Sequence, residues 1–228
     1  MKKIVLVRHG ESVWNKENKF TGWTDVSLSE HGIEEAKNAG KLLKEKNYIF
    51  DIAYSSLLKR ANDTLDYILE VLEQKDIDIV YNYMLNERHY GALQGLNKEE
   101  TGKKYGQEQL MLWRRGANTR PPLLDEKDER YPGNDIKYKD IDKNLLPLGE
   151  SLNDTMKRVS KYYNEVIKKT LKNNENIIIV AHGNSLRGLI KFLDNLTDEE
   201  VIKLEIPTGK PLCYELDDEL NIIKRYFI

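Results

Sequence analysis

IVLVRHGE at residues 4–11 is the stretch that decides the fold of this chain. Its first four residues form a continuous aliphatic run, which is typical of a strand buried on both faces inside a parallel sheet. The polar residues RHGE follow that run without a spacer. IIIVAHGN at residues 177–184 repeats the arrangement, because a second aliphatic run leads directly into a histidine and a glycine. Ligands of open α/β sheets bind outside the carboxyl ends of the strands, so both segments predict functional side chains at one edge of a parallel sheet.

Helices and strands alternate along the rest of the chain. Further strands are expected at residues 51–55, 77–81, 213–216 and 222–226. Helices are expected to begin near Ser29, Leu58, Ser151 (with Asp154 completing a capping box) and Asn184. This alternation predicts a three-layer α/β fold, in which a largely parallel sheet is flanked by helices.

Apolar spacing predicts which side of two helices faces the core. The side chains expected to point inward are Ile33, Ala36, Leu42 and Leu43 in the helix after Ser29, and Val159, Tyr163, Val166 and Ile167 in the helix after Ser151.

Residues 90–148 break the alternation. This segment is polar and contains PP at 121–122, PG at 132–133 and a charged run at 125–130, with helices expected only near 98–105 and 107–115. Irregular segments of this length are usually functional or disordered. We therefore expect one domain over residues 1–228, with residues 90–148 forming an insertion over the active site.

Composition excludes several classes of partner. The 228 residues include 36 Lys and Arg against 38 Asp and Glu, a formal net charge of −2, which argues against a duplex nucleic acid. Cys213 is the only cysteine, so no intramolecular disulfide is expected and a reducing compartment is favoured. The aliphatic run at residues 4–7 is too short for a signal-peptide core or a membrane helix. We expect a cytoplasmic protein without a membrane or nucleic-acid partner.

The two histidines at the strand ends suggest phosphoryl transfer. If the strands are neighbours, His9 and His182 converge, and neutral imidazole is nucleophilic near neutral pH. Arg8, and Arg60 at the start of the next helix, provide guanidinium groups that bind phosphate in a bidentate manner. The helix that begins near Asn184 directs its N-terminus to the same place, which favours an anion. A single histidine at a strand end is more often structural, but two strand–His–Gly units favour the functional interpretation.

The other histidines give no metal site. His31 is expected to be solvated at the start of a helix, whereas His89 suits either a structural or a functional position. The sequence has four scattered histidines, one cysteine and no HExxH or CxxC spacing, so no metal is expected.

Several motifs resemble the histidine phosphatase superfamily and, within it, its cofactor-dependent phosphoglycerate mutases. They occur in order over nearly the whole chain, and LNERHYGALQGLNK at 85–98 is highly specific to mutases. The other matching motifs are LVRHGES at 6–12, NKFTGW at 18–23, LSEHG at 28–32, SSLLKRA at 55–61, WRR at 113–115, PLGESL at 147–152, AHGNSLR at 181–187 and IPTG at 206–209. The resemblance implies the phosphoglycerate mutase-like form of the α/β fold.

The resemblance also implies a role for each matched residue. His9 would be the phosphorylated nucleophile, and His182 would stabilise the transferring phosphoryl group. Glu87 would be the general acid and base towards the substrate hydroxyl. The phosphoryl oxygens would be held by Arg8, Arg60 and Asn15, and the phosphoglycerate would contact Thr21, Gly22, Tyr90, Lys98, Arg114, Arg115, Gly183 and Asn184. On spacing alone, Arg114 and Arg115 are more typical of a solvated helix face.

The implied reaction interconverts 3-phosphoglycerate and 2-phosphoglycerate without a metal. 2,3-Bisphosphoglycerate would be both the intermediate and the primer, and a homodimer is expected. A phosphatase on the same fold is the alternative, although the motifs in residues 90–148 favour a mutase. Many family members carry a Lys-, Gly- or Ala-rich tail after the last strand, whereas this sequence stops at Ile228. A mutase has to keep water from its phosphohistidine, so this difference leaves the balance between the two activities open. A catalytically silent scaffold is disfavoured because both histidines, both arginines and Glu87 are present.

Overall fold

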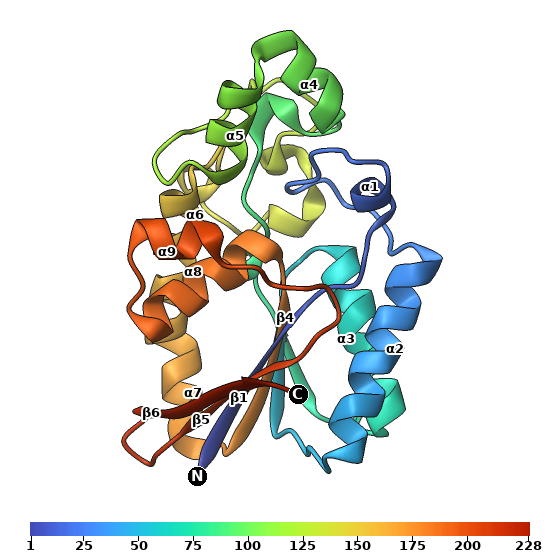
Figure 1. The fold of residues 1–228 in the computed structure, drawn as a ribbon, viewed down its shortest axis with the longest axis vertical. Coiled ribbons are helices and arrows are strands. Elements are labelled where there is room, and N and C mark those ends of the chain that lie inside the picture. Colours follow the sequence, from blue (N-terminus) through green and yellow to red (C-terminus); the bar gives the residue numbers. More distant parts are fainter.

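The two aliphatic runs lie side by side at the centre of a six-stranded sheet in the computed structural model, which describes residues 1–228 (Figure 1). β1 (Lys2–Arg8) pairs in parallel with β4 (Asn176–Ala181), and Arg8 lies opposite Ala181. The two strands therefore end at the same level, and the residues that follow them, His9 and His182, leave the sheet together.

The remaining strands extend the sheet on both sides, in the order β3-β2-β4-β1-β5-β6. β2 (Ile52–Ser55) and β3 (Asp78–Tyr81) continue the parallel part. β5 (Leu212–Leu216) pairs antiparallel with β1, and β6 (Ile222–Phe227) pairs antiparallel with β5. The predicted α/β fold with a largely parallel sheet is confirmed.

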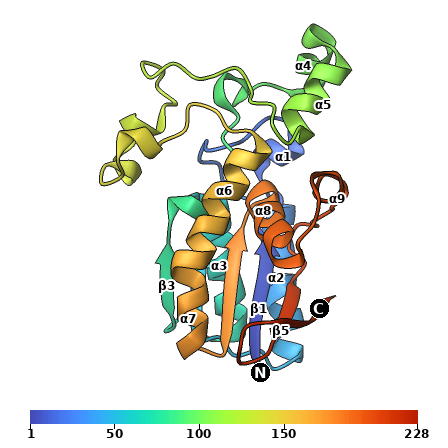
Figure 2. The same cartoon turned by 90° about the vertical axis from the view of Figure 1, so that its left-hand side faces the viewer.

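Alternate residues of the central strands face two separate cores. In β1, Ile4 and Leu6 belong to one buried cluster, whereas Val5 and Val7 belong to the other. A strand covered on both faces has to be apolar at every position, which explains the continuous aliphatic run. Helices α6 (Leu152–Tyr162), α7 (Lys168–Asn173) and α8 (Gly183–Asp194) cover the first face, and α2 (Glu30–Glu45) and α3 (Lys59–Leu72) cover the second (Figures 1 and 2).

The helix starts follow the capping residues of the sequence. Ser29 is the N-cap of α2, and its hydroxyl accepts the N–H of Gly32 at 3.0 Å. Ser151 and Asp154 form the expected capping box of α6. Each cap satisfies backbone N–H groups that would otherwise lack partners, which fixes where the helix begins.

Two residues predicted to face the core do not. Leu42 and Val166 are each 37% exposed. In α2 the buried positions are Ala36, Ala39 and Leu43, so Leu42, one position before Leu43, points off that face. Val166 lies in a π-helical segment, Tyr163–Ile167, between α6 and α7; its wider turn rotates the side chains away from the α-helical spacing.

The insertion lies above the carboxyl edge of the sheet (Figure 2). Its helices α4 (Lys98–Tyr105) and α5 (Gln107–Arg115) occur where the sequence predicts them. A small apolar cluster joins Trp23, which lies after β1, to Leu124, Tyr131, Tyr138 and Leu146. The insertion is thereby packed against the loop that follows β1.

The remaining elements are short. Helix α1 (Val13–Lys16) lies between β1 and α2, and α9 (Asp198–Lys203) follows α8. None of the helices is both long and apolar enough to cross a bilayer. Short 3₁₀ turns occur at Tyr83–Leu85, Gly91–Leu93, Pro132–Asn134, Ile136–Tyr138 and Lys143–Leu145.

Candidate active site

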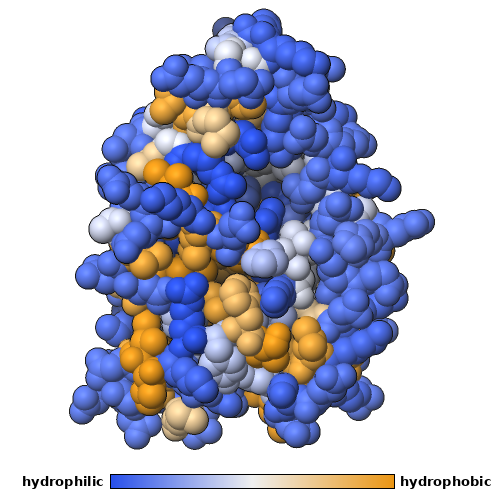
Figure 3. Space-filling view, in the orientation of Figure 1, coloured by the Kyte–Doolittle hydropathy of each residue, from blue (hydrophilic) through white to orange (hydrophobic).

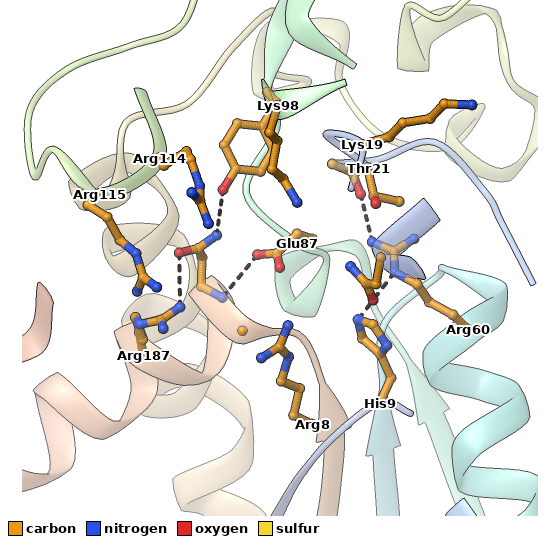
Figure 4. Close-up of a pocket in the computed structure, with 15 residues that line it drawn as sticks. Arg8, His9, Lys19, Thr21, Arg60, Glu87, Lys98, Arg114, Arg115 and Arg187 are labelled. Atoms are coloured by element: carbon orange, nitrogen blue, oxygen red, sulfur yellow. Dashed lines mark hydrogen bonds between the residues drawn. The ribbon is translucent and has the colours of Figure 1, made fainter. Parts of the chain in front are cut away.

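A cavity of about 130 Å³ opens between the carboxyl edge of the sheet and the insertion. In the space-filling view a recess with hydrophilic residues lies in this region (Figure 3). Thirteen of the fourteen site residues expected from the sequence line the cavity; the fourteenth, His182, is not a lining residue but packs against His9. The lining residues are Arg8, His9, Asn15, Lys19, Thr21, Gly22, Arg60, Glu87, Tyr90, Lys98, Arg114, Arg115, Gly183, Asn184 and Arg187 (Figure 4).

His9 is held as a neutral imidazole. Its ring is 3% exposed, and Nδ1 lies 2.6 Å from the carbonyl oxygen of Gly10. Because a carbonyl only accepts, Nδ1 carries the proton and Nε2 keeps its lone pair. Nε2 accepts a long hydrogen bond of 3.3 Å from Arg60 Nε. Burial, reinforced by the charges of Arg60 and Arg8, lowers the pKa of His9 well below its ordinary value.

His182 lies directly against His9, with ring centroids 4.9 Å apart in an edge-on arrangement. It is fully buried, and its Nε2 lies 2.8 Å from the hydroxyl of Ser56. That hydroxyl already accepts the N–H of Leu58, so its own proton is available to Nε2. Donation from Ser56 to Nε2 is the arrangement that places the ring proton on Nδ1, which is buried and has no hydrogen-bond partner. Burial and the charge of Arg60 lower the pKa of His182 well below its ordinary value.

Arg8 and Arg60 approach the histidines from two elements. Arg60, in the first turn of α3, is 1% exposed, and its Nη1 and Nη2 donate to the carbonyls of Thr24 and Gly22 at 3.0 and 2.8 Å. Arg8, the last residue of β1, donates from Nη1 to the carbonyl of Ile206 at 2.9 Å, while its buried Nε has no partner. Burial lowers the pKa of Arg60 to about 10, which still leaves it charged at neutral pH.

Glu87 faces the cavity from the loop before the insertion. Its Oε1 accepts the N–H of Arg88 at 2.8 Å and the N–H of Asn184 at 3.1 Å. Asn184 also donates from Nδ2 to the hydroxyl of Tyr90 at 3.1 Å (Figure 4). Since α8 begins at Gly183, one residue earlier than predicted, the bond to Oε1 comes from an N–H in the first turn of that helix.

The loop after β1 supplies polar groups opposite α8. The backbone N–H and side-chain Oδ1 of Asn15 are used in capping α1 through Ser12, which leaves its amide nitrogen without a partner. The hydroxyl of Thr21 is buried and also has no partner. Gly22 has φ +56°, and a Cβ there would lie 2.1 Å from Gln94 Oε1, so any other residue would strain the backbone and displace the Gln94 side chain.

The insertion contributes further cations. Lys98 lies in the first turn of α4, and Arg114 and Arg115 in the last turn of α5. Burial, with the charges of Arg114 and Arg8, lowers the pKa of Lys98 to about 8. The arginine pair thus faces the cavity, although its spacing alone is more typical of a solvated helix face.

Two cavity cations have no role in the sequence prediction, Lys19 and Arg187. Lys19 is ion-paired with Glu17 at 2.6 Å. Arg187 follows Asn184 by three residues in α8, and this spacing, which places both on one helix face, is a signal that could have identified it.

The other two histidines lie outside the cavity lining. His31 is 69% exposed, as expected. His89 is fully buried, with its ring 5.6 Å from that of Trp23, which favours the structural interpretation. No group of three or more His, Cys, Asp or Glu side chains is arranged to hold a metal ion.

Charge is the dominant property of the cavity. Its lining contains seven cationic side chains and one carboxylate, that of Glu87. Six of those cations, all except Lys19, have no carboxylate within ion-pair distance. Unpaired buried charges are costly, so an arrangement of this kind suits a ligand with more than one anionic group.

Comparisons with known proteins show the family and the fold. The family described as the histidine phosphatase superfamily (branch 1) matches residues 4–228. The fold is similar to alpha-ribazole phosphatase from Shigella flexneri, with 20% identity, a TM-score of 0.71 and coverage of 97% of this chain and 94% of that one. Mycobacterial glucosyl-3-phosphoglycerate phosphatase in complex with VO3 gives 21% identity, a TM-score of 0.73 and coverage of 100% and 98%. Phosphoglycerate mutase from Bacillus anthracis str. Sterne is 22% identical, with a TM-score of 0.65 and coverage of 94% of this chain and 88% of that one.

Proposed function

The chain belongs to branch 1 of the histidine phosphatase superfamily, and on this premise we propose that it is a 2,3-bisphosphoglycerate-dependent phosphoglycerate mutase. The observation that carries the proposal is the cavity lining, in which six unpaired cations surround one histidine nucleophile and one carboxylate. A phosphomonoester with a single charged end would leave several of these cations without a counter-charge. Phosphoglycerates bring a phosphate and a carboxylate on a three-carbon frame that carries a hydroxyl.

The first chemical step would be attack of His9 Nε2 on a phosphoryl group of the bisphosphate primer. The Nε2–phosphorus bond forms as the ester P–O bond breaks. Arg8 and Arg60 would hold the phosphoryl oxygens, because both guanidinium groups lie beside the ring. Nδ1–H of His182, which has no protein partner, is available for a further hydrogen bond. Preformed donors of this kind stabilise the transferring group without reorganisation.

Glu87 would act as general acid and base for the proton of the substrate hydroxyl. When the ester bond breaks, its carboxyl donates a proton to the leaving substrate oxygen, and in the reverse step its carboxylate accepts the proton of the attacking hydroxyl. Its Oε1 is held by two backbone N–H groups, so Oε2 is the oxygen free to face the substrate.

The mutase cycle requires the bisphosphate intermediate to reverse its orientation within the cavity. His9 gives its phosphoryl group to 3-phosphoglycerate to form 2,3-bisphosphoglycerate. After reorientation, the other phosphoryl group returns to His9, and 2-phosphoglycerate leaves. Three cations on the insertion side of the cavity support this step, namely Lys98, Arg114 and Arg115. They can bind the anionic groups of the intermediate that are not next to His9.

A phosphatase is the second candidate. It is favoured by the fold comparisons, which include proteins named as alpha-ribazole and glucosyl-3-phosphoglycerate phosphatases. The same His9 and Glu87 would serve it, with Glu87 activating water in place of the substrate hydroxyl.

A phosphorus NMR time course separates the two. Purified protein is incubated with 3-phosphoglycerate, a trace of 2,3-bisphosphoglycerate and EDTA. We expect 2-phosphoglycerate to grow to a plateau with little inorganic phosphate. Steady release of inorganic phosphate would contradict the mutase proposal and support the phosphatase. A His9→Ala variant is the control, and acid-labile phosphate on that variant would contradict the role of His9.

A further inference from the structure

We propose that Arg187 forms, with Arg115, a subsite for the anionic group of the substrate that is not being transferred. The inference rests on the proposed function and adds a specificity residue to it. Arg187 would distinguish substrates with a second anionic group from phosphomonoesters that lack one.

The position of Arg187 is well defined. The residue is 8% exposed, and its Nε donates to the carbonyl of Leu204 at 3.1 Å. Its Nη1 donates weakly to Asn184 Oδ1 at 3.5 Å. Its Nη2 has no partner, and the residue lines the cavity. Two sides of the guanidinium group are therefore anchored to the protein, while the third is free for a ligand (Figure 4).

Arg187 lies among like charges. A Cβ on Gly183 would be 3.4 Å from Arg187 Nη1 and 3.5 Å from Arg8 Cζ, so both guanidinium groups flank this glycine. Burial, with the charges of Arg115 and Arg8, lowers the pKa of Arg187 to about 10. No carboxylate is within ion-pair distance of any of these three arginines, although elsewhere Arg158, Arg120 and Arg225 each have one. An anion between Arg187 and Arg115 would relieve the repulsion.

Figure 4 shows where this subsite lies. Arg187 and Arg115 project from one side of the cavity, and His9 and Arg60 lie on the other side, with Glu87 and Arg8 between them. A group held by Arg187 would thus be remote from the reacting phosphorus. Arg187 also donates to the Oδ1 of Asn184, which leaves the Nδ2 of that amide directed to Tyr90.

Pairs of phosphoryl donors test the subsite. Glycerol 2-phosphate is 2-phosphoglycerate with the carboxylate replaced by CH₂OH, so the ratio of their kcat/KM values reports on the carboxylate. The ratio between 2,3-bisphosphoglycerate and 2-phosphoglycerate reports on a second phosphate. We expect Arg187→Gln to lower at least one of these ratios by about 10- to 100-fold, mainly through KM, because a charged hydrogen bond is lost. The rate with glycerol 2-phosphate should change little.

Lys191→Gln is the matched control. Lys191 is on the same helix and ion-paired with Asp198 of α9, but it does not line the cavity, so both ratios should keep their wild-type values. Arg187→Lys keeps a cation but not the two-sided anchoring, and it should lower the affected ratio by a smaller factor. This variant decides the question if Arg187→Gln does not fold.

Equal loss with all three donors would overturn the inference, since it would make Arg187 a structural anchor for Leu204 and Asn184. Unchanged ratios in both variants would overturn it as well. A wild-type enzyme that makes no 2-phosphoglycerate would instead contradict the proposed mutase, and the donor ratios could still be measured from released phosphate.

Discussion

Acid is expected to destabilise this protein through its buried histidines, and the loss in the free energy of unfolding can be worked out for His89. His89 is fully buried; its Nδ1 accepts the N–H of Gly91 at 3.0 Å, and its Nε2 has no partner. Burial, which outweighs the opposing charge of Glu150, lowers the pKa of His89 to about 4 from an ordinary value of 6.5. Arg158 acts in the same direction as burial.

The sign follows from the two states. Because the folded-state pKa is below the unfolded value, protonation favours the unfolded chain. The stabilising contribution is complete above pH 6.5 and is lost as the pH falls towards 4. At about 1.4 kcal/mol per pH unit, His89 accounts for about 3 kcal/mol in all, of which roughly half is lost between pH 6.5 and 5. His9 and His182, whose pKa values are also lowered, add losses of the same sign.

Urea unfolding at pH 6.5 and pH 5 measures this loss. Most carboxyl groups titrate below this window, so histidines dominate it. In His89→Asn the Oδ1 can replace Nδ1 as the acceptor for Gly91. The fall in the free energy of unfolding between pH 6.5 and pH 5 should then be smaller than in wild type by about 1–2 kcal/mol. His31→Asn, at an exposed position, is the control. An identical fall in His89→Asn and wild type would refute the argument, whatever the absolute stability of the variant.

Three more changes test the site and its support. Glu87→Gln should slow phosphoryl transfer from phosphoglycerates by about 10²- to 10⁴-fold. Phosphorylation of the enzyme by p-nitrophenyl phosphate should be little affected, because its leaving group needs no proton. Equal losses with both donors would argue against Glu87 as a general acid. Arg158→Met leaves Glu150 buried without its partner, so urea unfolding should show a loss of about 3–5 kcal/mol, and a loss under 1 kcal/mol would contradict the ion pair's role. Ser56→Ala removes the hydrogen bond to Nε2 of His182. The kcat should fall while KM changes little, and an unchanged kcat would show that the hydroxyl is not needed.

The fold was largely predictable from short aliphatic runs, because a strand covered on both faces leaves no polar position in the sequence. The order of the strands was not. Nothing in residues 213–216 specifies an antiparallel strand beside β1, because the neighbours of a strand depend on tertiary packing and not on its own sequence. The predictions for Leu42 and Val166 were wrong for a related reason. Apolar spacing does not mark the edge of the covered side of a helix, and a π-helical turn changes the spacing itself.

The site divides in the same way. Arg8, His9 and His182 were predictable from the strand ends, because parallel strands bring their carboxyl ends together. Arg114 and Arg115 depended on the family resemblance, since the pattern of an isolated helix does not show that one face covers a cavity. Arg187 was missed because it follows a run that marks α8 as a core helix, whose other residues in that stretch are buried.

The buried ion pair between Arg158 and Glu150 explains how a loop residue such as Glu87 can be placed accurately. The two side chains are 9% and 6% exposed and meet at 2.8 Å. Arg158 donates to the carbonyls of Asn86 and Glu87 at 3.2 and 3.3 Å, while Glu150 Oε2 accepts the N–H of His89 at 2.9 Å. The backbone is therefore held on both sides of Glu87 by one pair of side chains. Because Arg158 is in α6, which packs on the sheet that leads into His9, this ion pair ties the backbone at Glu87 to the core beneath His9.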